Sequence, residues 1–146
     1  MTMLTQPNKT RSLLVWIWIV GLFICVAMVA VFNWRHYVSI VDVKNYLPTV
    51  GELYAPFLTT IFGFWFASRG SKVQTISDYS HSLVAILLSV AYSGFNIFYL
   101  ASVFFSPNEE DIVKNALETM KTVSLILSPF VGLAIGFFFG EKHESS

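Results

Sequence analysis

Charged side chains and histidine are absent from four long stretches of this 146-residue chain. A helix needs about 20 apolar residues to cross the hydrocarbon core of a bilayer, with about 17 as the lower limit. The second stretch is the shortest, and we expect its helix to begin before the stretch does. The pattern therefore predicts an all-α integral membrane protein with four spans, at about 13–33, 49–69, 79–105 and 119–140. The charge-free stretches are Leu13 to Phe32, Leu53 to Ser68, Leu83 to Phe105 and Thr122 to Gly140.

Two local patterns suggest where helices begin. Thr49 and Glu52 fit a capping box, so we expect the second helix to begin near Pro48, after a connector on the membrane surface. Ser106 and Pro107 fit an N-cap and a first helical position, so the fourth helix is expected to begin outside the bilayer. The first stretch is expected to be an uncleaved span, because its apolar run of about 20 residues exceeds the 7–15 of a signal peptide.

One segment occurs twice. Residues 56–69, PFLTTIFGFWFASR, return as residues 129–142, PFVGLAIGFFFGEK, at an offset of 73 residues. An offset of half the chain predicts two tandem transmembrane hairpins, residues 1–73 and 74–146, within a single membrane domain. Pro56 and Pro129 occupy equivalent places, where each removes a helical hydrogen bond and is expected to bend its helix.

Each copy of the segment has a small residue at every fourth position. Residues four apart lie on one helix face, and small faces let helix backbones approach closely in lipid. The stripes predict packing either between the second and fourth helices of one chain or between chains of an oligomer, and the two can coexist. The stripe residues are Thr59, Gly63 and Ala67 in the first copy and Gly132, Gly136 and Gly140 in the second.

The third stretch has a row of polar side chains on one helix face. Polar residues inside a membrane usually face the bundle interior or water. The row is therefore either a hydrogen-bonded seam inside the bundle or the wet wall of a pore in an oligomer, with Asp78 and His81 at its cytoplasmic mouth. The candidate site residues are Asp78, Ser89, Tyr92, Ser93 and Asn96.

Composition and charge narrow the function classes. Hydrophobic residues make up 55% of the chain, charged residues 12%, and the net charge is zero. Nucleic acid is not expected as a partner, because binding it needs a concentrated basic surface. Cys25 is the single cysteine, and the three histidines have no ligand spacing. We therefore expect no disulfide, metal or cofactor. The sequence has no nucleophile at a readable spacing from a base, so we do not expect an enzyme.

The basic residues favour cytoplasmic termini. With four spans, five of the nine basic residues share the side of the termini, and basic residues prefer the cytoplasmic side. The five are Lys9, Arg11, Arg69, Lys72 and Lys142.

The chain resembles small four-helix membrane proteins of bacteria and phages. The endings GFWFASRG (63–70) and GFFFGEK (136–142) are similar to a helix ending common in such proteins, including holin-like ones. The chain length, the four spans and three residue pairs resemble phage-exclusion membrane channels. That resemblance implies a defence-linked protein that conducts ions across the bacterial inner membrane. The three pairs are Tyr54-Ala55, Ser68-Arg69 and Asp78-Tyr79.

These patterns lead to three hypotheses. The first is a homo-oligomeric pore or ion channel of the bacterial inner membrane, in which Ser89, Ser93 and Asn96 line the path. The second is a non-conducting accessory subunit, which binds a protein partner through its cytoplasmic segments, 69–82 and the tail after Gly140. The third is a holin-like lysis protein. All three hypotheses have the lipid bilayer as a partner.

Overall fold

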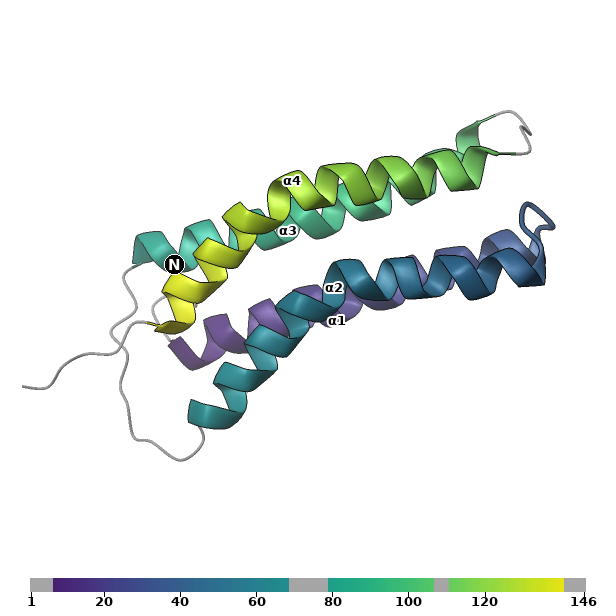
Figure 1. The fold of residues 1–146 in the computed structure, drawn as a ribbon. Helices are drawn as coiled ribbons and strands as arrows, with labels where there is room; N and C mark the ends of the chain where they lie inside the picture. Colours follow the sequence, from purple (N-terminus) through teal and green to yellow (C-terminus); the bar gives the residue numbers. More distant parts are fainter. Residues whose placement is uncertain (1–6, 69–78, 107–110, 141–146) are drawn as a thin grey trace, which may run out of the picture.

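The computed structural model describes residues 7–68, 79–106 and 111–140. These residues form four α-helices and one short 3-10 turn, so the all-α prediction is confirmed (Figure 1). The helices are α1 (Pro7–Trp34), α2 (Ile40–Ser68), α3 (Tyr79–Ser102) and α4 (Ile112–Gly140), and the turn is η1 (Val103–Phe105).

The helices form two antiparallel hairpins, α1–α2 and α3–α4, stacked as two layers (Figure 1). α1 packs against α2 and α3, and α4 packs against the same two helices. The order around the bundle is therefore α1, α2, α4, α3, and within the described ranges the backbones of the diagonal pairs do not approach each other. Because α1 lies beside α3 and α2 beside α4, the two hairpins face the same way.

Three of the four helices are long and apolar enough to cross a membrane, and this supports a membrane protein. The candidate spans are Thr10–Trp34, Ser82–Phe105 and Ile112–Phe139. α2 has 29 residues, or about 43 Å at 1.5 Å per residue, so it is long enough to cross. Its charged residues and internal prolines lower its mean hydropathy, and its crossing therefore remains a proposal.

The second helix begins at Ile40, so the prediction of a start near Pro48 is wrong. The Ser39 Oγ accepts a hydrogen bond from the Asp42 backbone N–H at 3.2 Å, and Asp42 Oδ2 accepts one from the Ser39 N–H at 3.3 Å. This reciprocal pair is a capping box. It lies ten residues before the predicted box of Thr49 and Glu52, so the helix begins earlier than predicted. Thr49 instead lies inside α2, where its hydroxyl donates to the carbonyl one turn earlier at 3.2 Å.

The start of the fourth helix is only partly described. α4 begins at Ile112 in the described residues, and Pro107 lies outside them. The Ser106 hydroxyl donates to the Ser102 carbonyl at 3.0 Å, on the α3 side of the connection.

An aromatic cluster of Trp18, Tyr54, Phe57 and Tyr92 joins the two hairpins inside the bundle. Trp18 of α1 stacks on Phe57 of α2 with ring centroids 4.5 Å apart, and its centroid lies 5.2 Å from that of Tyr92 of α3. Tyr54 meets Trp18 edge-on at 5.6 Å. These separations lie within the range of favourable aromatic pairs.

Equivalent residues of the repeated segment have different environments. Phe57 is 6% exposed, whereas its counterpart Phe130 is 60% exposed. The reverse holds one helix face away, where Phe66 is 61% exposed and its counterpart Phe139 is 8% exposed. The two hairpins stack in the same orientation. The face of the first hairpin that packs against the second is therefore equivalent to the face of the second hairpin that points out of the bundle. The duplication itself stays a prediction.

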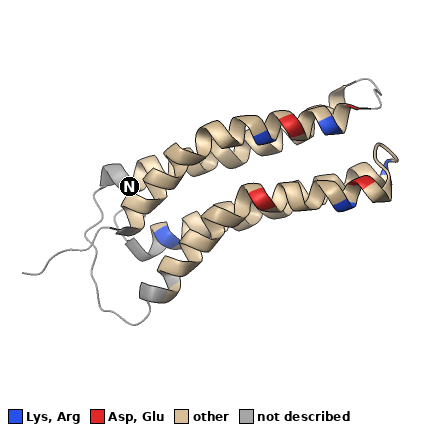
Figure 2. Ribbon diagram, viewed as in Figure 1, with Lys and Arg blue, Asp and Glu red and all other residues tan. Residues whose placement is uncertain are grey.

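Most charged residues described in the structure lie toward the end of the bundle where the two hairpin connections are (Figure 2). Arg11 lies in the first turns of α1, at the end of that helix away from the connection. Between them, the described residues of α1 and α3 include no Lys, Arg, Asp or Glu. The described charged residues in the two connections and in the adjoining halves of α2 and α4 are Arg35, Asp42, Lys44, Glu52, Asp111, Lys114, Glu118 and Lys121.

Candidate functional site

The polar row of α3 lies inside the bundle. Ser89, Tyr92, Ser93 and Asn96 are all buried, because their three- and four-residue spacing places them on the helix face that packs against the other helices. Asp78, the fifth predicted site residue, lies outside the described residues.

Hydrogen bonds from this row reach each of the other three helices. Trp18 Nε1 of α1 donates to Ser89 Oγ at 3.1 Å, and the Tyr92 hydroxyl donates to the Leu53 carbonyl of α2 at 3.0 Å. Ser124 Oγ of α4 donates to Asn96 Oδ1 at 2.8 Å. Such contacts contribute on average ~0.6 kcal/mol each in a membrane bundle. α3 is therefore the helix through which polar side chains tie the bundle together.

Two polar atoms of the row have no hydrogen-bond partner among the described residues, Asn96 Nδ2 and Ser93 Oγ. A buried donor or acceptor without a partner costs about 1–3 kcal/mol. Ordered water inside proteins typically satisfies such groups. The centre of the bundle therefore has spare hydrogen-bonding capacity at Ser93 and Asn96.

The arrangement within one chain fits the seam interpretation of the polar row. Ser89, Ser93 and Asn96 face other helices of the same chain, and each lies at 5% exposure or below. The pore-wall interpretation requires water to reach the inside of the bundle, and it stays a proposal.

The small-residue stripes make few contacts inside the chain. A methyl group added at Gly63 or Gly136 would meet no atom within 4 Å, and one at Gly132 would lie 3.9 Å from Phe57 Cε1, an ordinary contact. Thr59 is exposed. Ala67 and Gly140 lie within the helices, but their surroundings are outside the described residues.

Among the glycines whose surroundings the structure describes, Gly21 of α1 is the most tightly packed, and it was not among the predicted site residues. A methyl group there would lie 3.0 Å from Ser93 Oγ and 3.3 Å from Tyr54 Cε1. An isolated glycine in an apolar helical pattern is the signal that could have identified it. Trp18 and Ser124 were also missed, and a serine in a charge-free stretch is a signal of the same kind because it needs a partner.

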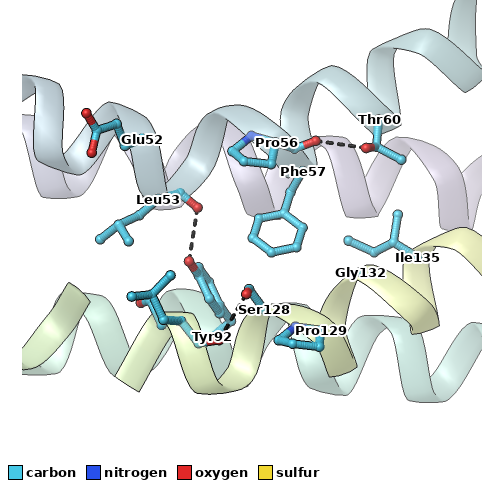
Figure 3. A pocket seen from close by; sticks show the side chains of 12 residues that line it. Glu52, Leu53, Pro56, Phe57, Thr60, Tyr92, Ser128, Pro129, Gly132 and Ile135 are labelled. Carbon is cyan, nitrogen blue, oxygen red and sulfur yellow. Dashed lines mark hydrogen bonds between the residues drawn. The ribbon is translucent and has the colours of Figure 1, made fainter. Parts of the chain in front are cut away.

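Pro56 and Pro129 lie inside α2 and α4, both of which change direction along their length (Figure 1). Both prolines line a cavity of about 360 Å³ between these two helices, together with Phe57 and Gly132 (Figure 3). The remaining lining residues are Glu52, Leu53, Thr60, Tyr92, Ser124, Leu125, Ser128 and Ile135.

Hydroxyl groups around the cavity bind backbone carbonyls near the prolines. Pro129 has no N–H to give to the Leu125 carbonyl four residues earlier, and Ser128 Oγ donates to that carbonyl at 3.1 Å. Thr60 Oγ1 donates to the Pro56 carbonyl at 2.8 Å. The Ser128 bond therefore satisfies the carbonyl that Pro129 leaves free, whereas the Thr60 bond is made to the carbonyl of Pro56 itself. Both hydroxyls are occupied.

One ion pair lies at the polar end of the cavity. Lys121 Nζ of α4 is 3.8 Å from Glu52 Oε2 of α2. Each residue directly precedes the charge-free stretch of its helix, so the pair lies where the apolar part of both helices begins. Both side chains are more than half exposed, and an exposed pair of this kind adds at most about 1 kcal/mol to stability.

The described residues contain no group of three His, Cys, Asp or Glu side chains placed to hold a metal ion. The Cys25 thiol is buried and lies 3.5 Å from the Tyr54 hydroxyl.

Comparison of the chain with protein-family models, with curated proteins and with solved structures finds no significant match. The resemblance to phage and bacterial membrane proteins therefore stays an expectation.

Proposed function

We propose that the protein forms a homo-oligomeric, ion-conducting pore in the bacterial inner membrane. In this proposal α2 is the fourth span, both termini are cytoplasmic, and the chain has no catalytic role. α2 runs alongside the candidate span α1 for most of its length (Figure 1), which supports its crossing.

The row of buried polar groups on α3 is the observation that carries the proposal. Ser82 and Asn96, both buried, are 14 positions apart, or about 21 Å along a helix. That is about two thirds of a ~30 Å hydrocarbon core. Polar side chains are expensive to bury compared with apolar ones, so a helix that only packs would be expected to use apolar residues there.

In this proposal the structure corresponds to a closed state. Trp18, Phe57 and Tyr92 are in contact across the centre of the bundle, beside Ser89. An aromatic contact of this kind blocks passage of hydrated ions, and hydrophobic constrictions gate channels in the same manner. Opening requires the two hairpins to move apart at this cluster.

Conductance of purified protein in liposomes tests the proposal, with Asn96→Leu as the main variant. We expect the variant to lose ion flux, because leucine fills the space of the amide but binds neither water nor ions. Asn96→Gln keeps the amide and should retain part of the flux. Leu133→Ile is the control, since Leu133 of α4 is 60% exposed and lies outside the polar row.

Size-exclusion chromatography in detergent shows whether each variant keeps the assembly state of the wild type. The pore assignment is wrong if Asn96→Leu conducts like the wild type while keeping the same assembly.

A non-conducting accessory subunit is the second candidate function. It is favoured by the hydrogen bonds of Ser89, Tyr92 and Asn96, which are made to other helices of the same chain, so that one chain forms a bonded bundle by itself. A monomeric mass in detergent together with no flux from the wild type would support this candidate. Lysis at a fixed time after expression would instead support the holin-like hypothesis.

A further inference from the structure

The outward face of α3 corresponds to the inward face of α1. At the repeat offset of 73 residues, most α1 residues that are buried between the helices correspond to α3 residues that are exposed. Gly21 and Gly94 form one such pair, and both are glycine. Four further buried α1 residues, Leu14, Trp18, Cys25 and Phe32, have the exposed counterparts Leu87, Ala91, Phe98 and Phe105, whereas buried Thr10, Val15 and Val29 correspond to the partly buried Leu83, Leu88 and Ser102.

The outward face of α1 shows the converse relation. Val20 and Phe23 of α1 are exposed, whereas their counterparts on α3, Ser93 and Asn96, are buried. Trp16 is likewise exposed, and its counterpart Ser89 is buried. These outward α1 residues are apolar, although their buried counterparts are polar.

The same relation holds in the layer of α2 and α4. Phe64 of α2 stacks on Phe139 of α4 with ring centroids 5.6 Å apart. Their counterparts are Phe137 on α4 and Phe66 on α2, both mostly exposed. The first hairpin therefore has one face covered by the second hairpin, and the second hairpin has the corresponding face uncovered.

We propose that this uncovered face binds the first hairpin of a second copy of the chain, in the same orientation in which the two hairpins bind within one chain. The α3 face that contains Gly94 packs on the α1 face that contains Val20, just as the Gly21 face of α1 packs on Ser93 of α3. Phe137 of one copy packs on Phe66 of the next. This arrangement rests on the homo-oligomer of the proposed function and specifies how it is built.

Gly94 is the residue that favours a protein partner over lipid. Within the chain, Gly21 lacks room for a methyl group because Ser93 lies against it, whereas a methyl group at Gly94 would meet no atom within 4 Å. Glycine in the middle of an exposed helix face is unfavourable by about 0.5–1 kcal/mol relative to alanine. Close approach of a neighbouring helix, as in small-residue contacts between membrane helices, compensates for it.

The contact is head-to-tail, because two different faces meet. Such contacts form rings when successive copies are rotated and open filaments when the series does not close. A closed ring is the outcome that agrees with the homo-oligomer of the proposed function.

Cysteine cross-linking distinguishes this contact from a symmetric one. In a Cys25→Ser background, Val20→Cys and Gly94→Cys are introduced separately and together, and liposomes are oxidised with copper phenanthroline. We expect the double variant to form a ladder of disulfide-linked oligomers that ends at one mass, and each single variant to stay monomeric. The counterpart contact of Ser93 on Gly21 places these side chains within disulfide reach,.

A matched pair controls for random collision in the bilayer. Val20→Cys with Leu125→Cys joins the same α1 face to an exposed α4 residue that lines the α2–α4 cavity, and it should give no ladder. A second pair, Phe66→Cys with Phe137→Cys, tests the other layer and should give the same final mass.

The outcomes separate the contact from the pore. Dimers from either single variant would mean a symmetric contact, and a ladder no stronger than the control would mean that lipid covers this face; either result overturns the proposal. A ladder without ion flux supports the head-to-tail contact and refutes the pore. If the Cys25→Ser protein conducts ions but neither cysteine pair gives a ladder, the head-to-tail contact is refuted and the pore proposal stands.

Discussion

Replacing Gly21 with alanine tests the closest contact between the hairpins. The added methyl carbon would lie 3.0 Å from Ser93 Oγ, 3.1 Å from Ser93 Cβ and 3.3 Å from Tyr54 Cε1. Carbon atoms pack best at about 3.5–4.0 Å. The Ser93 hydroxyl can rotate away, but its Cβ is fixed by the α3 backbone, so α1 and α3 must move apart by a few tenths of an ångström.

Two opposing terms set the size of the effect. Forcing an extra carbon into a packed interior costs about 1–3 kcal/mol. Alanine in place of glycine in a helix interior returns about 1 kcal/mol. We expect Gly21→Ala to lower the free energy of unfolding by about 0–2 kcal/mol in net.

Gly51→Ala is the matched control on α2. A methyl group at Gly51 would meet no atom within 4 Å, so only the helix term applies, and we expect a gain of about 0.5–1 kcal/mol. The two variants should therefore differ by about 1–3 kcal/mol. The measurement is unfolding of each variant in mixed micelles with increasing dodecyl sulfate, followed by circular dichroism. Equal stabilities for Gly21→Ala and Gly51→Ala would refute the contact of α1 with Ser93.

Two further predictions concern the seam and the connection end of the bundle. Ser89→Ala leaves the buried indole N–H of Trp18 unpaired and should destabilise the protein by about 1–3 kcal/mol. A double-mutant cycle with Trp18→Phe should show a coupling of about 0.5 kcal/mol or more. Zero coupling would contradict the hydrogen bond between Trp18 and Ser89. At Tyr46, burial and nearby carboxylates, Asp42 first among them, raise the phenol pKa above 10.0. A raised pKa contributes stability below pH ~10 that is lost as pH rises through the folded value, so Tyr46→Phe should lose less stability than the wild type in unfolding curves between pH ~9 and ~12, and matching pH profiles would contradict this.

Much of the fold follows from charge-free stretches, because lipid excludes charge from helices that cross it. All four helices contain such a stretch, the third stretch continuing through η1, and those of α1, α3 and α4 lie in candidate spans. α2 was placed too late because its first turns contain Asp42 and Lys44, a polar pattern that resembles a surface connector. Capping by Ser39 decided where the helix begins, and a serine three residues before an aspartate is a weaker signal than one before a glutamate.

The candidate site was predictable on α3 but not across the bundle. Helical periodicity placed Ser89, Ser93 and Asn96 on one face, and the structure has them on one face. Their partners, Trp18 and Ser124, depend on which helices are neighbours and how each is rotated about its axis. Periodicity within one helix contains neither quantity, so the hydrogen bonds between helices could not be derived from it. The α2–α4 cavity depends on the same two quantities.

The repeat did not predict the environments of its residues either, because similar sequences do not imply similar surroundings. If the two hairpins were related by a twofold axis along the bundle, Phe57 and Phe130 would lie in equivalent surroundings, and their small-residue stripes would do the same. The contacts of α1 with α3 and of α2 with α4 exclude such an axis, since a twofold axis would place equivalent helices on the diagonals. Hairpins that face the same way always leave one copy of the contact surface uncovered, however many are joined in a row. The repeated segment therefore bears on assembly between chains as much as on packing within one.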